Sequence, residues 1–127
     1  MLGKTEPRLF TPPLRKLTKR TSLGFAAIEY AREILGMDLY PWQEWILIHA
    51  LEIVGDLETS NWRFRYRTVV ILVSRQNGKT ALSKIIASFF QNVLGVESIF
   101  GTSLSLDKAE EGWDAVVYEQ ENNPILA

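Results

Sequence analysis

The residue types that hold the phosphates of a nucleotide occur together in one segment: Ser74, Arg75, Gln76, Asn77, Gly78, Lys79 and Thr80. Gly78 lets the backbone approach a phosphate closely, because any β-carbon would stand in the way. Lys79 supplies a mobile positive charge for the β- and γ-phosphates, and the Thr80 hydroxyl is a Mg²⁺ ligand in such loops. The full pattern also has a glycine where this chain has Val73. The sequence therefore predicts a phosphate-binding loop of incomplete pattern, with ATP and Mg²⁺ as its ligands.

Three residues of this segment leave alternatives open. A turn between a strand and a helix can also carry Thr80 as a helix cap and Lys79 as an exposed side chain. The guanidinium of Arg75 can pair with a phosphate oxygen or stabilise charge in the transition state, but it can equally be a surface charge. The residue types alone do not choose between these roles.

The elements on either side of the segment decide whether its backbone can face a phosphate. Residues 67–73 are mostly β-branched, which predicts a strand buried on both faces. Residues 81–94 have apolar side chains at helical spacing, and the pattern ends at Gly95. The loop would then precede a helix, whose N-terminal N–H groups and dipole favour phosphate.

Two more elements are expected towards the C-terminus. Residues 97–102 resemble a short strand, and an amphipathic helix begins at Ser105 or Asp107 and ends before Asn122. The order strand, loop, helix, strand, helix is a βαβ crossover. It predicts a parallel sheet with flanking helices, and therefore the α/β class.

Two helices are expected ahead of the first predicted strand. One spans residues 23–35, follows a threonine–serine cap and ends at Gly36. The other begins at Pro41, which suits the first position of a helix, and continues to a stop at Gly55. Residues 56–64 have no clear periodicity and are expected to be a polar linker.

The N-terminal residues 1–20 form a basic arm, which holds six lysines and arginines and one glutamate in a chain of net charge −1. Such an arm is either solvated and flexible, which we expect, or in contact with nucleic acid or a membrane surface. The chain has no cysteine, which excludes disulfides and thiolate metal sites. Its longest apolar run is too short to span a bilayer, and no signal peptide follows the basic start.

The loop, with arginine and glutamine in place of the usual glycine-rich stretch, resembles the deviant Walker A motif of the large terminase subunits of tailed bacteriophages. Upstream, the segment Tyr40, Pro41, Trp42 and Gln43 looks like the family's adenine-recognising glutamine in its aromatic setting. The similarity spans roughly residues 38–127, and the loop is its specific part. A polar residue on an amphipathic helix is the alternative explanation for Gln43.

The resemblance implies a P-loop NTPase, an ATP-driven motor that packages double-stranded DNA into a capsid in the host-cell cytoplasm. Lys79 and Thr80 would hold phosphate and Mg²⁺, and Arg75 would act with Lys79 in catalysis at the γ-phosphate. Gln43 would read adenine. The implied partners are DNA, the capsid portal protein and the small terminase subunit, with a homo-oligomeric ring for the full-length motor and no membrane.

The family's Walker B strand and nuclease carboxylates have no counterpart here. The segment most similar to a Walker B strand, residues 115–119, is expected to belong to a solvated helix. We therefore expect residues 21–127 to be the incomplete N-terminal part of a P-loop ATPase domain in a longer protein, able to bind ATP but not to turn it over. A fragment of a P-loop nucleic-acid helicase and a non-hydrolysing nucleotide-binding assembly module are the alternatives.

Other candidate residues are weaker. His49 has no second histidine or cysteine at metal-ligand spacing and is expected to be a packing residue. The four tryptophans can stack on bases, but packing is the simpler explanation. Arg63, Arg65 and Arg67 alternate, so a strand would place them on one face, either as phosphate contacts or as a solvated strand entry.

Overall fold

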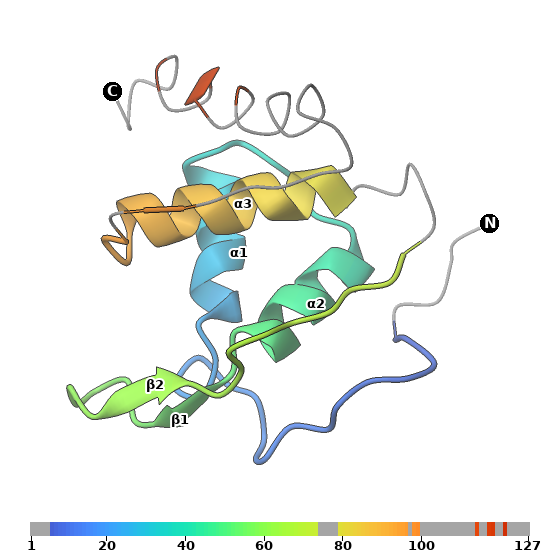
Figure 1. The fold of residues 1–127 in the computed structure, drawn as a ribbon, viewed down its shortest axis with the longest axis vertical. Helices are drawn as coiled ribbons and strands as arrows, with labels where there is room; N and C mark the ends of the chain where they lie inside the picture. The colour runs from blue at the N-terminus through green and yellow to red at the C-terminus, as the bar shows by residue number, and fades with distance from the viewer. Residues whose placement is uncertain are drawn as a thin grey trace. The chain divides into compact units, whose positions relative to one another are not determined.

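The computed structural model describes residues 6–73, 79–96, 98–99, 114, 117–118 and 121. The chain divides into two compact units, Met1–Ile71 and Leu72–Ala127. The described part of the first unit holds two helices and an antiparallel hairpin, and that of the second unit is mainly one helix (Figure 1). In chain order the elements are α1 (Gly24–Glu33), α2 (Pro41–Ala50), β1 (Ile53–Gly55), β2 (Trp62–Phe64) and α3 (Lys79–Asn92).

Helix α1 confirms the first predicted helix. Ser22 lies just before it, and its Oγ accepts a hydrogen bond from the N–H of Gly24 at 3.0 Å. The same hydroxyl donates to the carbonyl of Ile48 in α2 at 2.6 Å. At the other end Gly36 has a φ of 65°, the left-handed conformation with which helices commonly end. The buried face of α1 consists of Gly24, Ala27, Ile28, Tyr30 and Ala31.

Helix α2 begins at Pro41 as predicted, but the expected continuation to Gly55 is wrong, because the helix ends at Ala50. The next residues pair with the chain in front of α1. The N–H of Leu23 donates to the carbonyl of Leu51 at 3.0 Å, and the N–H of Ile53 donates to the carbonyl of Thr21 at 2.9 Å. Pairing with a segment distant in sequence therefore overrides the apolar pattern that favoured a longer helix.

The hairpin replaces the linker expected over residues 56–64. Strands β1 and β2 pair antiparallel, with Val54 opposite Arg63. Asp56 organises the turn, because its Oδ1 accepts from the N–H of Glu58 at 3.0 Å and its Oδ2 pairs with Arg20 at 2.9 Å. The Glu58 N–H and the Arg20 guanidinium hold the pKa of Asp56 below its ordinary value.

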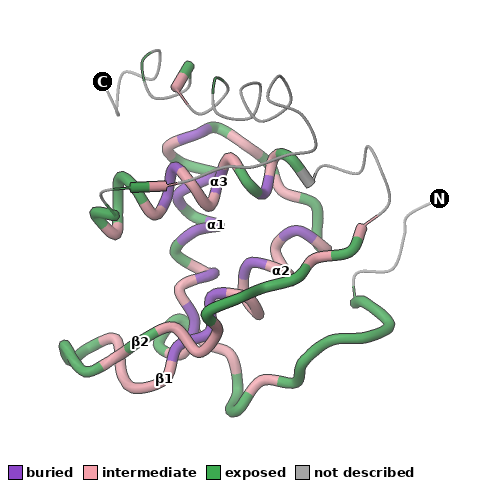
Figure 2. The backbone as a smooth tube through the Cα atoms, viewed as in Figure 1, coloured by how far each residue is buried: buried purple, intermediate pink, exposed green. Residues whose placement is uncertain are grey.

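Residues 67–73 form no strand in the structure, and the prediction of a strand buried on both faces is wrong. The side chains of Val70 and Leu72 are 77% and 93% exposed. Figure 2 colours most of the stretch after β2 as exposed. β-Branched residues favour a strand through packing against a neighbouring strand, and the described residues offer this segment none. The parallel sheet and the α/β class expected of the chain stay predictions.

Helix α3 confirms the helix predicted over residues 81–94, and Gly95 follows with a φ of 71°. Its buried residues are Leu82, Ile85, Ser88 and Phe89, which share one helical face. The strand predicted over 97–102 lies outside the described residues except for Ser98 and Ile99, which are not in a strand. Of the last predicted helix, only residues 114, 117, 118 and 121 are described, and they are helical.

No helix of the described segments combines the length and the apolar character that crossing a membrane requires.

Candidate functional site

The predicted phosphate-binding loop is described only at its end. Ser74, Arg75, Gln76, Asn77 and Gly78 lie outside the described residues, as does the side chain of Lys79. The backbone of Lys79 forms the first residue of α3, and Thr80, the second, is exposed. The Gly-Lys-Thr sequence therefore stands at the start of a 14-residue helix, the position that a phosphate-binding loop requires.

The start of α3 suits an anion. The first backbone N–H groups of a helix have no partner within the helix, and the aligned peptide dipoles give this end a partial positive charge. No acidic side chain lies in the first turn of α3 to neutralise that charge. Thr80 is exposed, and its hydroxyl is an oxygen ligand of the kind that Mg²⁺ accepts.

Gln43 lies in the first turn of α2 and is buried, with 3% of its surface exposed. Its Oε1 accepts a hydrogen bond from the N–H of Tyr40 at 2.9 Å, which is one half of a capping box. This bond gives Gln43 a structural role at the helix start. The predicted recognition of adenine would use the same carboxamide. An experiment must therefore distinguish the capping role of Gln43 from its role in base recognition.

An aromatic cluster joins the N-terminal arm to α2. The rings of Trp45 and His49 are stacked with their centroids 3.6 Å apart, and Phe10 meets Trp45 edge-on at 5.0 Å. Nδ1 of His49 lies 2.8 Å from the carbonyl oxygen of Trp45, so it must carry the proton and donate. His49 and Trp45 are packing residues, as the sequence indicated.

Sequence reasoning missed the most buried charge in the described part of the first unit. The residue Glu52 is 1% exposed, yet both of its carboxylate oxygens have partners. Its Oε1 accepts from Nη1 of Arg65 at 2.9 Å, and its Oε2 accepts from the N–H of Leu14 at 3.0 Å. The same Arg65 nitrogen donates to the carbonyl of Pro12 at 2.8 Å. We call this set of contacts the Glu52 junction; it fastens the arm to the hairpin.

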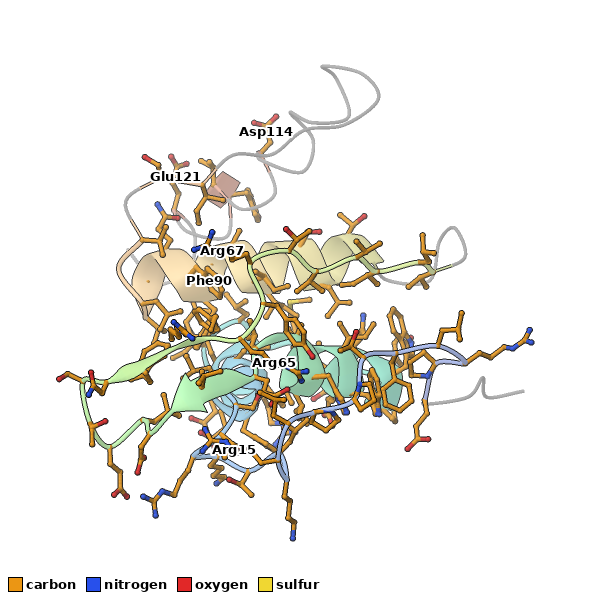
Figure 3. All side chains as sticks on the ribbon, turned by 60° about the horizontal axis from the view of Figure 1, so that its bottom comes forward. Arg15, Arg65, Arg67, Phe90, Asp114 and Glu121 are labelled. Atoms are coloured by element: carbon orange, nitrogen blue, oxygen red, sulfur yellow. The ribbon has the colours of Figure 1, made fainter. Side chains whose placement is uncertain are left out.

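Arg15 extends the contact between arm and hairpin. Its Nη2 donates to the carbonyls of Ile53 and Gly55, on the edge of β1 that β2 does not use. Figure 3 labels Arg15, which belongs to the arm, and Arg65, which directly follows β2 and contacts Glu52 and Pro12. The arm, expected to be flexible, has no helix or strand over residues 6–20 but makes these hydrogen bonds.

The alternating arginines divide between two roles. The side chain of Arg65 is only 18% exposed and is engaged by Glu52, whereas Arg63 and Arg67 are exposed. The sequence carried a signal for the pairing of Arg65 with Glu52, because Glu52 is a lone carboxylate between the apolar residues Leu51 and Ile53. A buried carboxylate needs a cationic or hydrogen-bonding partner, and the alternating arginines were the candidates.

Comparison of the chain with known protein families, curated proteins and solved structures found no match. Within the described residues, no group of three or more histidine and carboxylate side chains is placed to hold a metal ion.

Proposed function

We propose that this chain is the ATP-binding portion of a viral DNA-packaging motor, a large terminase subunit that couples ATP hydrolysis to DNA translocation into a capsid. The observation that carries the proposal is the start of α3 at Lys79, directly after Gly78. A motif of three residues has little weight by itself. Its position at the N-terminus of a long helix without an acidic first turn gives it the electrostatics of a phosphate site.

In this proposal each residue of the loop has a distinct task. Lys79 would neutralise the β- and γ-phosphates, and the Thr80 hydroxyl would hold Mg²⁺, which would supply further positive charge to the phosphates. Arg75 stabilises the negative charge that develops on the γ-phosphate as the bond to it breaks. Residues 74–78 supply backbone N–H groups to the phosphate oxygens. Orientation of the attacking water is assigned to no residue of this chain.

The partners follow from the same proposal. Double-stranded DNA is the translocated substrate, the capsid portal protein is the docking partner, and the small terminase subunit delivers the DNA. The full-length motor acts as a homo-oligomeric ring in the host cytoplasm.

Calorimetric titration with ATP·Mg²⁺ tests the phosphate site. We expect Lys79→Ala to weaken binding by about 10- to 100-fold, because a hydrogen bond to a charged group contributes ~1.5–3 kcal/mol. Lys84→Ala is the matched control, since it removes a lysine from the same helix beyond its first turn. The control should bind as the unmodified chain does. Equal affinity for all three chains would rule out the phosphate-binding role.

Gln43 is proposed to select adenine, because a carboxamide donates to and accepts from one base edge simultaneously. We expect the unmodified chain to prefer ATP over GTP and Gln43→Glu to lose that preference. Glutamate keeps the oxygen that accepts from Tyr40 N–H but lacks the donor that adenine needs. Competition between ATP and GTP measures the ratio of affinities.

Gln43→Ala completes this experiment. It removes both the cap and the base contact, so it should lose the adenine preference and also unfold more easily than Gln43→Glu. An ATP-to-GTP ratio that neither substitution changes would leave Gln43 with the structural role alone.

A further inference from the structure

Residues 6–15 of the arm touch the rest of the first unit without joining its regular structure. We call them the strap. Within the described chain they form no helix or strand and make no hydrogen bond between two backbone groups. Leu9 and Leu14 are 92% and 66% exposed, so these side chains add little to the core. The core of this unit comes from later residues, among them Ala27, Ala31, Leu47, Leu51 and Ile53. The strap can therefore leave without removing a core side chain.

In the Glu52 junction the strap contributes only uncharged backbone groups. These are the N–H of Leu14, which donates to Glu52, and the carbonyl of Pro12, which accepts from Arg65. The ion pair itself joins two residues outside the strap, so Glu52 and Arg65 remain paired when the strap leaves. Water can take the place of both backbone partners, and exchanging such a bond for one to water costs little net free energy. Departure of the strap therefore separates no ion pair.

The other contacts of the strap are equally replaceable. Arg15 donates to the carbonyls of Ile53 and Gly55, two neutral acceptors on the free edge of β1. Phe10 lies edge-on to Trp45 with the ring centroids 5.0 Å apart, yet it is 47% exposed. All of these contacts fall within residues 10–15, so one short piece of chain carries the whole attachment.

The chain is anchored from Lys16 onward. The Thr21 hydroxyl oxygen accepts from the N–H of Thr18 at 2.7 Å, and the hydroxyl donates to the carbonyl of Lys16 at 2.8 Å. Arg20 pairs with two carboxylates of the hairpin turn, at 2.9 and 3.0 Å. These bonds lie outside the strap and survive its departure. The junction between Arg15 and Lys16 is therefore the place where a moving strap meets a fixed turn.

We propose that the strap opens and closes as one unit, hinged between Arg15 and Lys16, while the rest of the first unit stays folded. Opening gives the N–H of Leu14 to water and uncovers part of the Trp45 ring. In the closed state Arg15 occupies two carbonyls on an edge of β1 that another strand can otherwise use, so the strap covers an open sheet edge. Local openings of this kind need far less free energy than unfolding of the whole unit.

Amide hydrogen exchange of the whole chain, measured by NMR, tests the proposal. The Leu14 amide reports on the strap, because it is bonded to Glu52 only in the closed state. The Ile53 amide reports on the body of the unit, because it donates to the carbonyl of Thr21 at 2.9 Å. We expect the protection of Leu14 to be at least about 100-fold lower than that of Ile53. Low concentrations of urea should leave the exchange of Leu14 unchanged, since opening the strap exposes little surface.

Two substitutions at opposite ends of the attachment test whether the strap moves as one unit. Arg15→Ala should lower the protection of Leu14 by about 10- to 100-fold, because two hydrogen bonds from a charged donor are lost. Phe10→Ala should lower it by about 2- to 10-fold through the lost aromatic contact. Neither should change the protection of Ile53. Lys16→Ala removes the neighbouring exposed cation, whose side chain makes no hydrogen bond or ion pair within the described residues, and should change neither amide.

Three results would overturn the proposal. Equal protection of the two amides would mean that the strap opens only when the whole unit unfolds. A Leu14 amide without any protection would mean that the closed state is not populated. A Phe10→Ala chain with unchanged protection of Leu14 would mean that the contacts break separately. All these residues belong to the first unit, so the outcome does not depend on the predicted phosphate-binding loop.

Discussion

Replacing Glu52 by alanine is expected to lower the free energy of unfolding of the first unit by about 3–5 kcal/mol, the range for breaking one side of a buried ion pair. The carboxylate is 1% exposed, and its removal leaves the mostly buried guanidinium of Arg65 without its counter-charge. It also leaves the N–H of Leu14 without an acceptor. Urea unfolding followed by tryptophan fluorescence measures the change, because Trp45 and Trp62 both lie in this unit.

Two control variants separate the effect on stability of breaking the buried ion pair from the effect of removing a charge in general. Glu58→Ala breaks the exposed ion pair with Arg20 and should cost less than about 1 kcal/mol. The double variant Glu52→Leu/Arg65→Met should recover most of the lost stability, because apolar side chains of similar volume can replace a buried pair. If Glu52→Ala costs no more than Glu58→Ala, the Glu52 junction does not hold the arm in solution.

Gly24→Ala is expected to destabilise the packing of α1 against α2 by about 2–3 kcal/mol, as overpacking of a tight contact does. A β-carbon at this position would lie 2.4 Å from Cα of Ile48 and 2.4 Å from the carbonyl oxygen of Leu47. Both are backbone atoms and cannot rotate away, so one helix must shift. The free energy of unfolding in urea measures the effect.

The sign of the change makes this test decisive. Helix propensity alone favours alanine over glycine by about 1 kcal/mol, so an uncrowded Gly24 would give a more stable variant. A stabilised Gly24→Ala would therefore contradict the close approach of the two helices.

Elements determined by local sequence were predictable. The start of α2 at Pro41 and the ends of α1 and α3, shortly before Gly36 and Gly95, depend on residues close to each boundary. The helix behind the motif was also predictable, because the apolar period over residues 81–94 is local. These features can be predicted without knowing which elements pack against one another. The phosphate site itself stays a prediction.

Elements determined by distant partners were not predictable. Helix α2 stops early because residues 51–53 pair with residues 21–23, and no local signal marks that pairing. Residues 67–73 have the composition of a buried strand, but composition does not supply the neighbouring strand. The Glu52 junction needs the arm, β1 and the end of β2 to meet, so one lone carboxylate in the sequence was an insufficient signal.

The Glu52 junction also sets an order of events during synthesis on the ribosome. Leu14 meets a partner 38 residues later in the chain, and the Arg65 nitrogen reaches back 53 residues to Pro12. Closing such long loops is entropically costly, so these contacts form after the local turns of α1 and α2. The arm is translated before α1, α2 and the hairpin, since chains are made from the N-terminus, yet it docks only once Arg65 has been added. Until then Glu52 lacks its cation, so the arm, although it is translated before the rest of its unit, is the last part of that unit to fold.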